Sequence, residues 1–230
     1  MTKKTFSIQK LLPPYGWVCL GILIFSQAMT FYFTRLVLLA LRIAPMSLAT
    51  ALDERIPFRP EWILIYVLAF ATWAVTLVLL LRQRKEHVYR TMGAYLTTLA
   101  LSAAFFLLLP GTIQRPEVTG RDFFSWLTRL IYALDPPNNL CPSLHVACNY
   151  YCWRALWDTE GIPRWYRRFN FVFLLLVCGS ILLVKQHVLV DIPTAVLVSE
   201  LPLQLSKRFR WERLGYAVER RIQIGREKRK

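Results

Sequence analysis

Histidine and acidic residues are scarce in this chain, which holds 3 His and 14 Asp and Glu among 230 residues. Lys and Arg number 29, so the formal net charge is +15. Nucleic-acid-binding proteins often carry such a charge, but zinc-finger, helix-turn-helix and RNA-binding aromatic motifs are all missing from the sequence. The basic residues instead fall between apolar runs and in the tail. We therefore expect no nucleic-acid partner.

The cysteines lack the spacing of a disulfide framework, a zinc site or a redox pair. Cys141 stands alone in a predicted loop, and the other four of the five lie inside apolar segments. A group of closely spaced metal-ligating residues is also missing. We therefore expect neither a metal ion nor another cofactor.

Apolar residues are what the chain has in abundance. Hydrophobic residues make up 55% of the sequence, aromatic residues 14%, and the mean hydropathy is +0.36. They occur in long clusters, as in membrane-spanning helices, rather than with the period of a soluble amphipathic helix. The first cluster is too long for a signal-peptide core and has no clear cleavage site, so we expect it to be retained.

Six spans can be drawn, which predicts an all-α bundle of six transmembrane helices in a lipid bilayer. Their ranges are 15–43, 62–81, 92–109, 143–157, 169–184 and 188–205. The last two are almost contiguous, so we expect them to form a tight antiparallel hairpin. The predicted domain organisation is a cytoplasmic N-terminus over 1–14, a membrane domain over 15–205 and a basic cytoplasmic tail over 206–230. The tail is consistent with either an interfacial helix or a solvated segment.

The distribution of charge predicts the orientation of these spans. The N-terminus, the loops after the second and fourth spans, and the tail together hold 20 of the 29 basic residues, whereas the alternate loops hold 6. Positive charge accumulates on the cytoplasmic side of membrane proteins. We therefore expect both termini in the cytoplasm of a multi-pass protein, which for a bacterial chain means the inner membrane.

This orientation brings four ionisable groups to the extracytoplasmic face. Arg115 follows the third span, His145 opens the fourth, His187 closes the fifth and Asp191 begins the sixth. Ionisable groups at the membrane boundary are costly, and they usually mark a functional site. Four distant segments that converge at one depth are stronger evidence than any single motif.

The residue types and spacing favour phosphoryl transfer through a phosphohistidine, without a metal. Asp191 is placed to accept a hydrogen bond from His187, which would leave the other ring nitrogen as a nucleophile. His145 would donate a proton to the leaving oxygen, beside Ser143 at a helix start where free amides bind anions. Arg115 and Lys185 would supply cations for phosphate oxygens.

Each of these residues also has a purely structural interpretation. A histidine at the interface is equally consistent with a snorkelling or capping role, and Ser143 with a simple N-cap. Asp191 is consistent with an ion pair to Lys185, and Arg115 with an interfacial anchor. Because all of these roles would have to coincide on one face, we favour a catalytic site.

The motifs resemble those of the type-2 phosphatidic acid phosphatase superfamily of integral membrane proteins. Its first signature is represented by Arg115-Pro116 and its second by Pro142-Ser143-Leu144-His145. Its third is represented by Ser180, His187 and Asp191 at matching spacing. The resemblance covers about 53–205, including the segment 53–58 before the second span.

The resemblance implies a role for each matched residue. His187 would be the nucleophile, Asp191 its orienting partner and His145 the general acid. Phosphate oxygens would be held by three residues, Arg115, Ser143 and Ser180.

Two phosphate-binding cations of the family pattern are absent from this sequence. Leu108 replaces the lysine of the first signature and Ile181 the arginine of the third, while Leu144 replaces a glycine. In these departures the sequence is similar to the branch of the superfamily that contains inositol phosphorylceramide synthases and related inositol phosphotransferases. Lys185 is the residue we expect to replace one lost cation.

The sequence is consistent with three functions. The first is a membrane lipid phosphatase, which hydrolyses a lipid phosphate monoester or pyrophosphate at the extracytoplasmic face. The second is a lipid phosphotransferase, which moves a phospho-head group to a lipid or polyol hydroxyl. The third is a catalytically inactive relative that binds an anionic lipid. The sequence does not indicate an oligomeric state.

Overall fold

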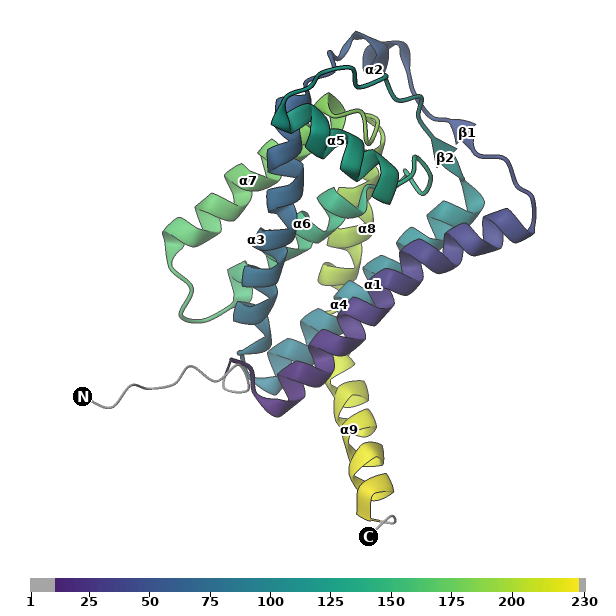
Figure 1. Ribbon diagram of the computed structural model, residues 1–230. Coiled ribbons are helices and arrows are strands. Elements are labelled where there is room, and N and C mark those ends of the chain that lie inside the picture. The colour runs from purple at the N-terminus through teal and green to yellow at the C-terminus, as the bar shows by residue number, and fades with distance from the viewer. Residues whose placement is uncertain (1–10, 228–230) are drawn as a thin grey trace.

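The computed structural model describes residues 11–227, with side chains as far as Arg221. The described part of the chain is almost entirely helical (Figure 1), which confirms the predicted all-α class. Its elements in chain order are α1 Pro14–Ala40, β1 Met46–Ser47, α2 Ala51–Arg55, η2 Pro60–Trp62, α3 Ile63–Leu81, α4 Lys85–Leu108, β2 Gly111–Thr112, α5 Phe123–Leu134, α6 Leu144–Ala155, η3 Leu156–Asp158, α7 Arg164–Leu183, α8 Asp191–Leu205 and α9 Trp211–Glu227.

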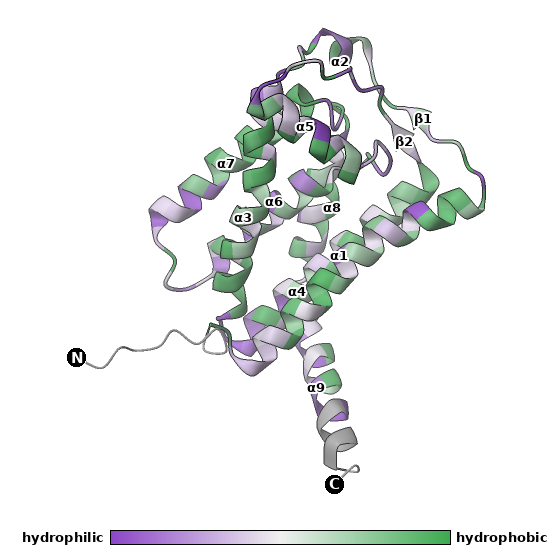
Figure 2. Cartoon of the chain, in the orientation of Figure 1, coloured by the Kyte–Doolittle hydropathy of each residue, from purple (hydrophilic) through white to green (hydrophobic). Residues whose placement is uncertain are grey.

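Four helices are long and apolar enough to cross a membrane. They are α1, the η2–α3 segment Pro60–Leu81, α4 and α7, with lengths of 20 to 27 residues. Figure 2 shows apolar residues along most of the length of these helices, which form an apolar belt between the two ends of the bundle on this side. A bilayer core of about 30 Å needs about 20 helical residues, so each of the four is sufficient. The structure is therefore compatible with a membrane protein.

The two remaining predicted spans correspond to shorter helices. At 1.5 Å per residue, α6 with 12 residues and α8 with 15 are about 18 and 22 Å long. In α6, nine of the twelve residues are buried inside the protein. Other helices rather than lipid therefore surround most of α6.

The expectation of a tight hairpin between the fifth and sixth spans is wrong. Helix α6 packs against both α7 and α8, which make few direct contacts with each other. The turn 184–190 joins them at one end, and α6 separates them along their length. Helix α6 also packs against α3 and α4, so it is the central helix of the bundle.

One end of the bundle is covered by the short elements (Figure 1). The parallel strands β1 and β2 pair Met46 with Gly111. Helix α2 begins with a capping box, in which the Thr50 side chain bonds the Asp53 amide and the Asp53 side chain bonds the Thr50 amide. Helix α5 begins at the N-cap Asp122, whose carboxylate accepts from two amides. These elements form a cap over the ends of α3, α6 and α7.

The tail forms a helix at the opposite end of the bundle. Helix α9 packs against α4, where Trp211 lies on Gly93 and Gly215 on Tyr89. The Lys85 ammonium and the Glu219 carboxylate are 2.6 Å apart. The start of α1 lies at this same end (Figure 1). The tail is therefore helical, and its placement at a membrane surface stays a prediction.

Candidate active site

The turn 184–190 carries His187 immediately before α8. Its Nδ1 lies 2.9 Å from Oδ2 of Asp191, the first residue of α8. The same oxygen accepts from the Val188 amide at 3.1 Å, and the Asp191 side chain is fully buried. A carboxylate held in this way fixes the imidazole tautomer and leaves Nε2 with its lone pair. The spacing of four residues correctly predicts this contact, although His187 lies in a turn and not on a helix.

The second histidine lies at the start of α6. Ser143 is the N-cap of this helix, and its Oγ accepts from the Val146 amide at 3.4 Å. This geometry places His145 in the first turn, against the aromatic side chains of α3. Its ring lies 4.0 Å from that of Tyr66 and 5.5 Å from that of Trp73, centre to centre. These rings fix the plane of the imidazole.

The two histidines face each other across a short gap. Their ring centres are 6.2 Å apart, at an interplanar angle of 59°. Nε2 of His145 is buried and has no hydrogen-bond partner among the described residues. A backbone hydrogen bond of 3.3 Å from the Ser143 amide to the Asp191 carbonyl connects the two segments.

Arg115 comes to the same place from the loop after β2. Its guanidinium lies over the Tyr132 ring at 4.4 Å and donates to the Tyr132 carbonyl at 3.3 Å. A further hydrogen bond joins it to the Gln186 side chain, next to His187. Burial lowers the pKa of Arg115 below its usual value, opposed by Asp135, Tyr132 and Tyr66. An arginine remains protonated after such a shift, so the site holds a fixed positive charge.

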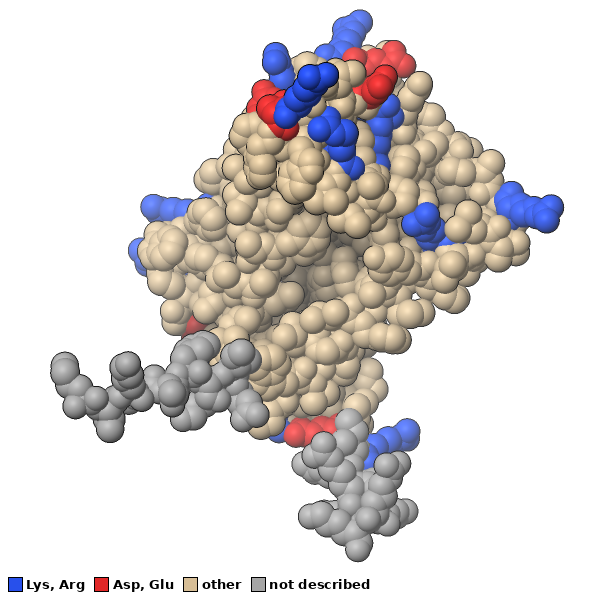
Figure 3. All heavy atoms as spheres, viewed as in Figure 1, with Lys and Arg blue, Asp and Glu red and all other residues tan. Residues whose placement is uncertain are grey.

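A cavity of about 610 Å³ joins these groups. Its polar end is formed by Arg115, His145, Gln186 and His187. Its other walls come from α1, α3, the end of α5 and the loop 135–140, and they are mainly apolar apart from Gln27, Asp135, Asn138 and Asn139. Figure 3 shows a hollow in the uncharged surface between α1 and α3, at mid-height in the molecule. Arg115 and the two histidines thus line a cavity whose walls are mainly apolar.

Unpartnered polar atoms are concentrated in this cavity. Eight buried side-chain nitrogen or oxygen atoms have no hydrogen-bond partner among the described residues, and six of them belong to residues that line it. The six are Trp73 Nε1, Arg115 Nε, Asn138 Oδ1, Asn139 Oδ1, His145 Nε2 and Gln186 Nε2. Buried polar groups are normally satisfied. The concentration of exceptions is typical of a site that binds a polar ligand.

Two predicted phosphate ligands point elsewhere. Ser180 is fully buried in α7, and its hydroxyl donates to the Val177 carbonyl at 2.9 Å. Lys185 Nζ donates to the Asp53 carbonyl at 2.7 Å and does not line the cavity. Both side chains therefore donate to backbone carbonyls and do not line the cavity. Ser143 is also predicted to hold phosphate, but it does not line the cavity either. Its side chain caps α6.

The positions of the two missing cations are also outside the cavity. Leu108 is 79% exposed at the end of α4, and Ile181 is fully buried in the core of the bundle. Neither residue lines the cavity. Among the residues that line the cavity, Arg115 therefore carries the positive charge. It is hydrogen-bonded to the uncharged side chain of Gln186.

Several residues of the site were missed in the sequence. Gln186 directly precedes His187, but its amide carries no charge that would mark it as a site residue in the sequence. Asn138 and Asn139 lie in the loop before α6, and Tyr66 donates to Asp135 at 2.7 Å across the bundle. The available signal was a run of polar residues in the loop 135–139 of a strongly apolar chain. This run belongs to the site because Asp135 contacts Tyr66 of α3, and the spacing of residues in the sequence does not predict that contact.

Comparison of the chain with family models, curated proteins and solved structures finds no match. Within residues 11–227, no group of three His, Cys, Asp or Glu side chains is arranged to hold a metal ion.

Proposed function

We propose that the protein is an integral membrane enzyme that transfers phosphoryl groups from a lipid phosphate through a phosphohistidine at His187. The observation that carries the proposal is the pairing of a carboxylate-bound imidazole with a second imidazole and an arginine at the polar end of an apolar cavity. This is the chemistry of the superfamily that the sequence motifs resemble.

The first step forms the bond between His187 and phosphorus. The Nε2 lone pair attacks the phosphorus, the bond to the lipid oxygen breaks, and that oxygen takes a proton from His145. Asp191 stabilises the cationic imidazole that results. Arg115 stabilises the charge on the non-bridging oxygens.

The second step reverses these roles. Water loses a proton to His145 and attacks the phosphorus, the nitrogen–phosphorus bond breaks, and phosphate leaves. His187 and His145 return to their starting states, so the proposed cycle needs no metal or other cofactor.

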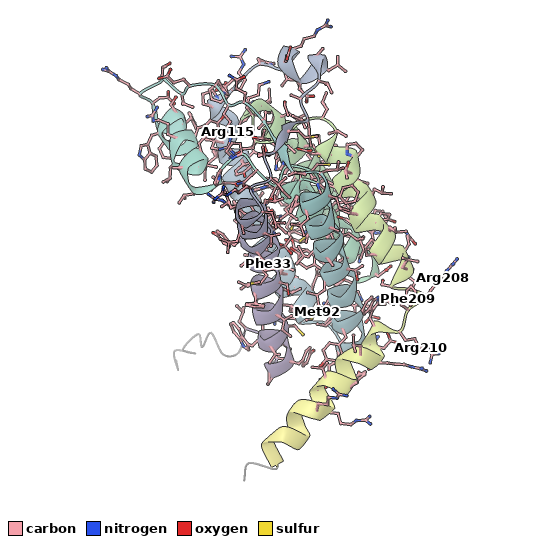
Figure 4. All side chains as sticks on the ribbon, turned by 90° about the vertical axis from the view of Figure 1, so that its right-hand side faces the viewer. Phe33, Met92, Arg115, Arg208, Phe209 and Arg210 are labelled. Atoms are coloured by element: carbon pink, nitrogen blue, oxygen red, sulfur yellow. The ribbon has the colours of Figure 1, made fainter. Side chains whose placement is uncertain are left out.

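We further propose six membrane crossings, with α6 and α8 as short crossings enclosed by the longer helices. The cap of α2, β1, β2 and α5 would then lie on the extracytoplasmic side with the site. The cationic turn between α3 and α4 and the helix α9 would lie in the cytoplasm, in agreement with the charge asymmetry. Figure 4 supports this arrangement, because Arg115 lies at the opposite end of the bundle from Arg208 and Arg210.

A second function, phosphotransfer to a hydroxyl group, is favoured by a separate observation. The cavity is also lined by Asp135 and by Asn138 and Asn139, whose side-chain oxygens have no hydrogen-bond partner among the described residues. These oxygens are acceptors that suit the hydroxyl groups of a lipid or polyol. Such an acceptor would replace water in the second step.

The deciding experiment uses the full chain, purified in detergent, with a panel of lipid phosphates in the presence and absence of alcohol acceptors. Release of inorganic phosphate supports the phosphatase, whereas product formed only with an acceptor supports the transferase. Turnover should be lost in His187→Ala and fall about 10²- to 10⁴-fold in His145→Ala.

The matched control is His87→Ala, because His87 lies at the other end of the bundle and contacts Thr159. This variant should retain activity. Activity that survives His187→Ala would sink the phosphohistidine mechanism. Lipid binding by the wild type without any turnover would instead support the inactive relative.

A further inference from the structure

A second cavity, distant from the histidines, combines cations with aromatic walls. It lies where η3 and the loop after it lead into α7, and its volume is about 720 Å³. Three of its seven lining residues are arginines and the other four are apolar. The seven are Trp153, Trp157, Arg164, Arg167, Arg168, Phe171 and Val172. We refer to it as the arginine groove.

The three arginines have different environments. Arg167 donates to the carbonyls of Trp157 and Thr159, at 3.4 and 2.8 Å, so it stabilises the loop that closes one side of the groove. Arg164 and Arg168 are exposed, and neither forms a salt bridge with any carboxylate among the described side chains. The groove therefore presents positive charge that no carboxylate of the described side chains neutralises in a salt bridge.

Several other cations at this end of the molecule do have partners. Arg84 pairs with Glu160, Lys85 with Glu219 and Arg154 with Glu200, each within 3.0 Å. Figure 3 shows basic side chains at the left edge of the molecule, where α7 begins, beside an uncharged surface. The arginine groove is thus a site of local charge imbalance next to the apolar belt.

The apolar part of the groove is ordered by aromatic contacts. The Trp153 ring lies 4.9 Å from that of Phe171 and 6.1 Å from that of Trp157, centre to centre. Trp157 and Val172 are each more than half exposed. Tryptophan and arginine side by side are typical of the depth at which lipid head groups meet acyl chains.

We propose that the arginine groove binds an anionic phospholipid. The phosphate would lie between Arg164 and Arg168, and an acyl chain would follow α7 over Phe171 and Val172. The ligand is a lipid rather than a soluble anion because four of the seven lining residues are apolar, and on α7 the arginines are followed by Phe171 and Val172 in the next turn. The site is separate from the histidines, since α7 extends 20 residues, about 30 Å, between the two.

The test counts bound lipids by native mass spectrometry of the full chain in detergent. Phosphatidylglycerol is titrated against phosphatidylcholine with the same acyl chains, and we expect one tightly bound phosphatidylglycerol. Each arginine near an anionic lipid contributes about 1 kcal/mol, or about fivefold in affinity. Arg164→Gln/Arg168→Gln should therefore weaken binding about 25-fold.

The matched control is Arg220→Gln/Arg221→Gln, which removes the same charge from exposed positions of α9 that line neither cavity. This control should bind phosphatidylglycerol as the wild type does. Equal weakening in both double variants, or equal affinity for phosphatidylcholine, would overturn the proposal. If the groove variant melts earlier than the wild type without lipid, the single variant Arg168→Gln takes its place, with about fivefold weakening expected.

Discussion

At the scale of single residues, Asp53 determines the position of the turn that carries His187. Its Oδ1 accepts from the Leu189 amide at 2.7 Å, and its backbone carbonyl accepts from Lys185 Nζ at 2.7 Å. Asp53 therefore contacts the turn on both sides of the histidine, although more than 130 positions separate them in the chain. Lys185, predicted to hold phosphate, is better explained as one half of this contact.

The protonation of Asp53 links this contact to pH. Burial raises the pKa of Asp53, but hydrogen bonds from Thr50 and Leu189 and the charge of Lys185 outweigh it, so the net pKa lies below the ordinary 3.8. A depressed carboxyl pKa stabilises the fold above the unfolded value, and this stability is lost as the pH falls through the folded value.

We therefore expect Asp53→Asn to be less stable than the wild type at pH 7, by about 1–3 kcal/mol, the usual cost of losing hydrogen bonds to a charged group. The difference should shrink below pH 3.8 as the wild-type carboxylate is protonated. Thermal unfolding across this range measures it. A difference that is constant with pH would contradict the assigned role of the charge.

At the scale of helices, burial explains which helix bounds could be predicted from the sequence and which could not. Long apolar runs predict α1, α3, α4 and α7 because lipid-facing helices must be both long and apolar. Helix α6 is surrounded by protein, so its length is set by packing. The bounds of α6 and its position between α7 and α8 depend on contacts among three helices, which hydropathy does not encode.

The contacts of the candidate site also fall into two groups, those that the sequence predicts and those that it does not. The contact of His187 with Asp191 is local and follows from their spacing, and the capping role of Ser143 follows from its place before a helix. The contacts of Lys185 with Asp53 and of Arg115 with Gln186 join distant segments. No periodic pattern predicts such contacts, so they appear only in three dimensions.

The packing of α9 on α4 depends on a glycine. A Cβ atom at Gly93 would lie 2.6 Å from Trp211 Cγ, which is closer than carbon atoms pack. We expect Gly93→Val to displace α9, so that trypsin cleaves at its arginines faster than in the wild type. Gly21→Val is the matched control, because a Cβ there has no neighbour within 4 Å. Equal cleavage of both variants would show that α9 does not depend on this contact.

At the scale of the whole molecule, the two ends differ in what they carry. One end holds the cap and Arg115, which lines the same cavity as His145 and His187, and the other end holds α9 and the start of α1 (Figures 1 and 4). Cys141, which lies in the loop before α6, is only 4% exposed and is a poor labelling site. The orientation is better tested with new cysteines at exposed positions of each end.

Ser47→Cys lies in β1 and Glu160→Cys in the loop before α7, and both positions are exposed. A membrane-impermeant maleimide should label Ser47→Cys on intact cells. Glu160→Cys should be labelled only after permeabilisation. The unsubstituted chain is the control, since four of its five cysteines are buried. The reverse pattern would invert the proposed topology.

The hollow between α1 and α3 determines how the concentration of substrate should be expressed for the proposed enzyme. A substrate that enters through the apolar belt arrives by diffusion in the plane of the bilayer, without crossing water. Its relevant concentration is then a mole fraction among the surrounding lipids rather than a molarity in solution. Inert lipid added to a vesicle would slow turnover by dilution in two dimensions, even with the amount of substrate in the tube unchanged.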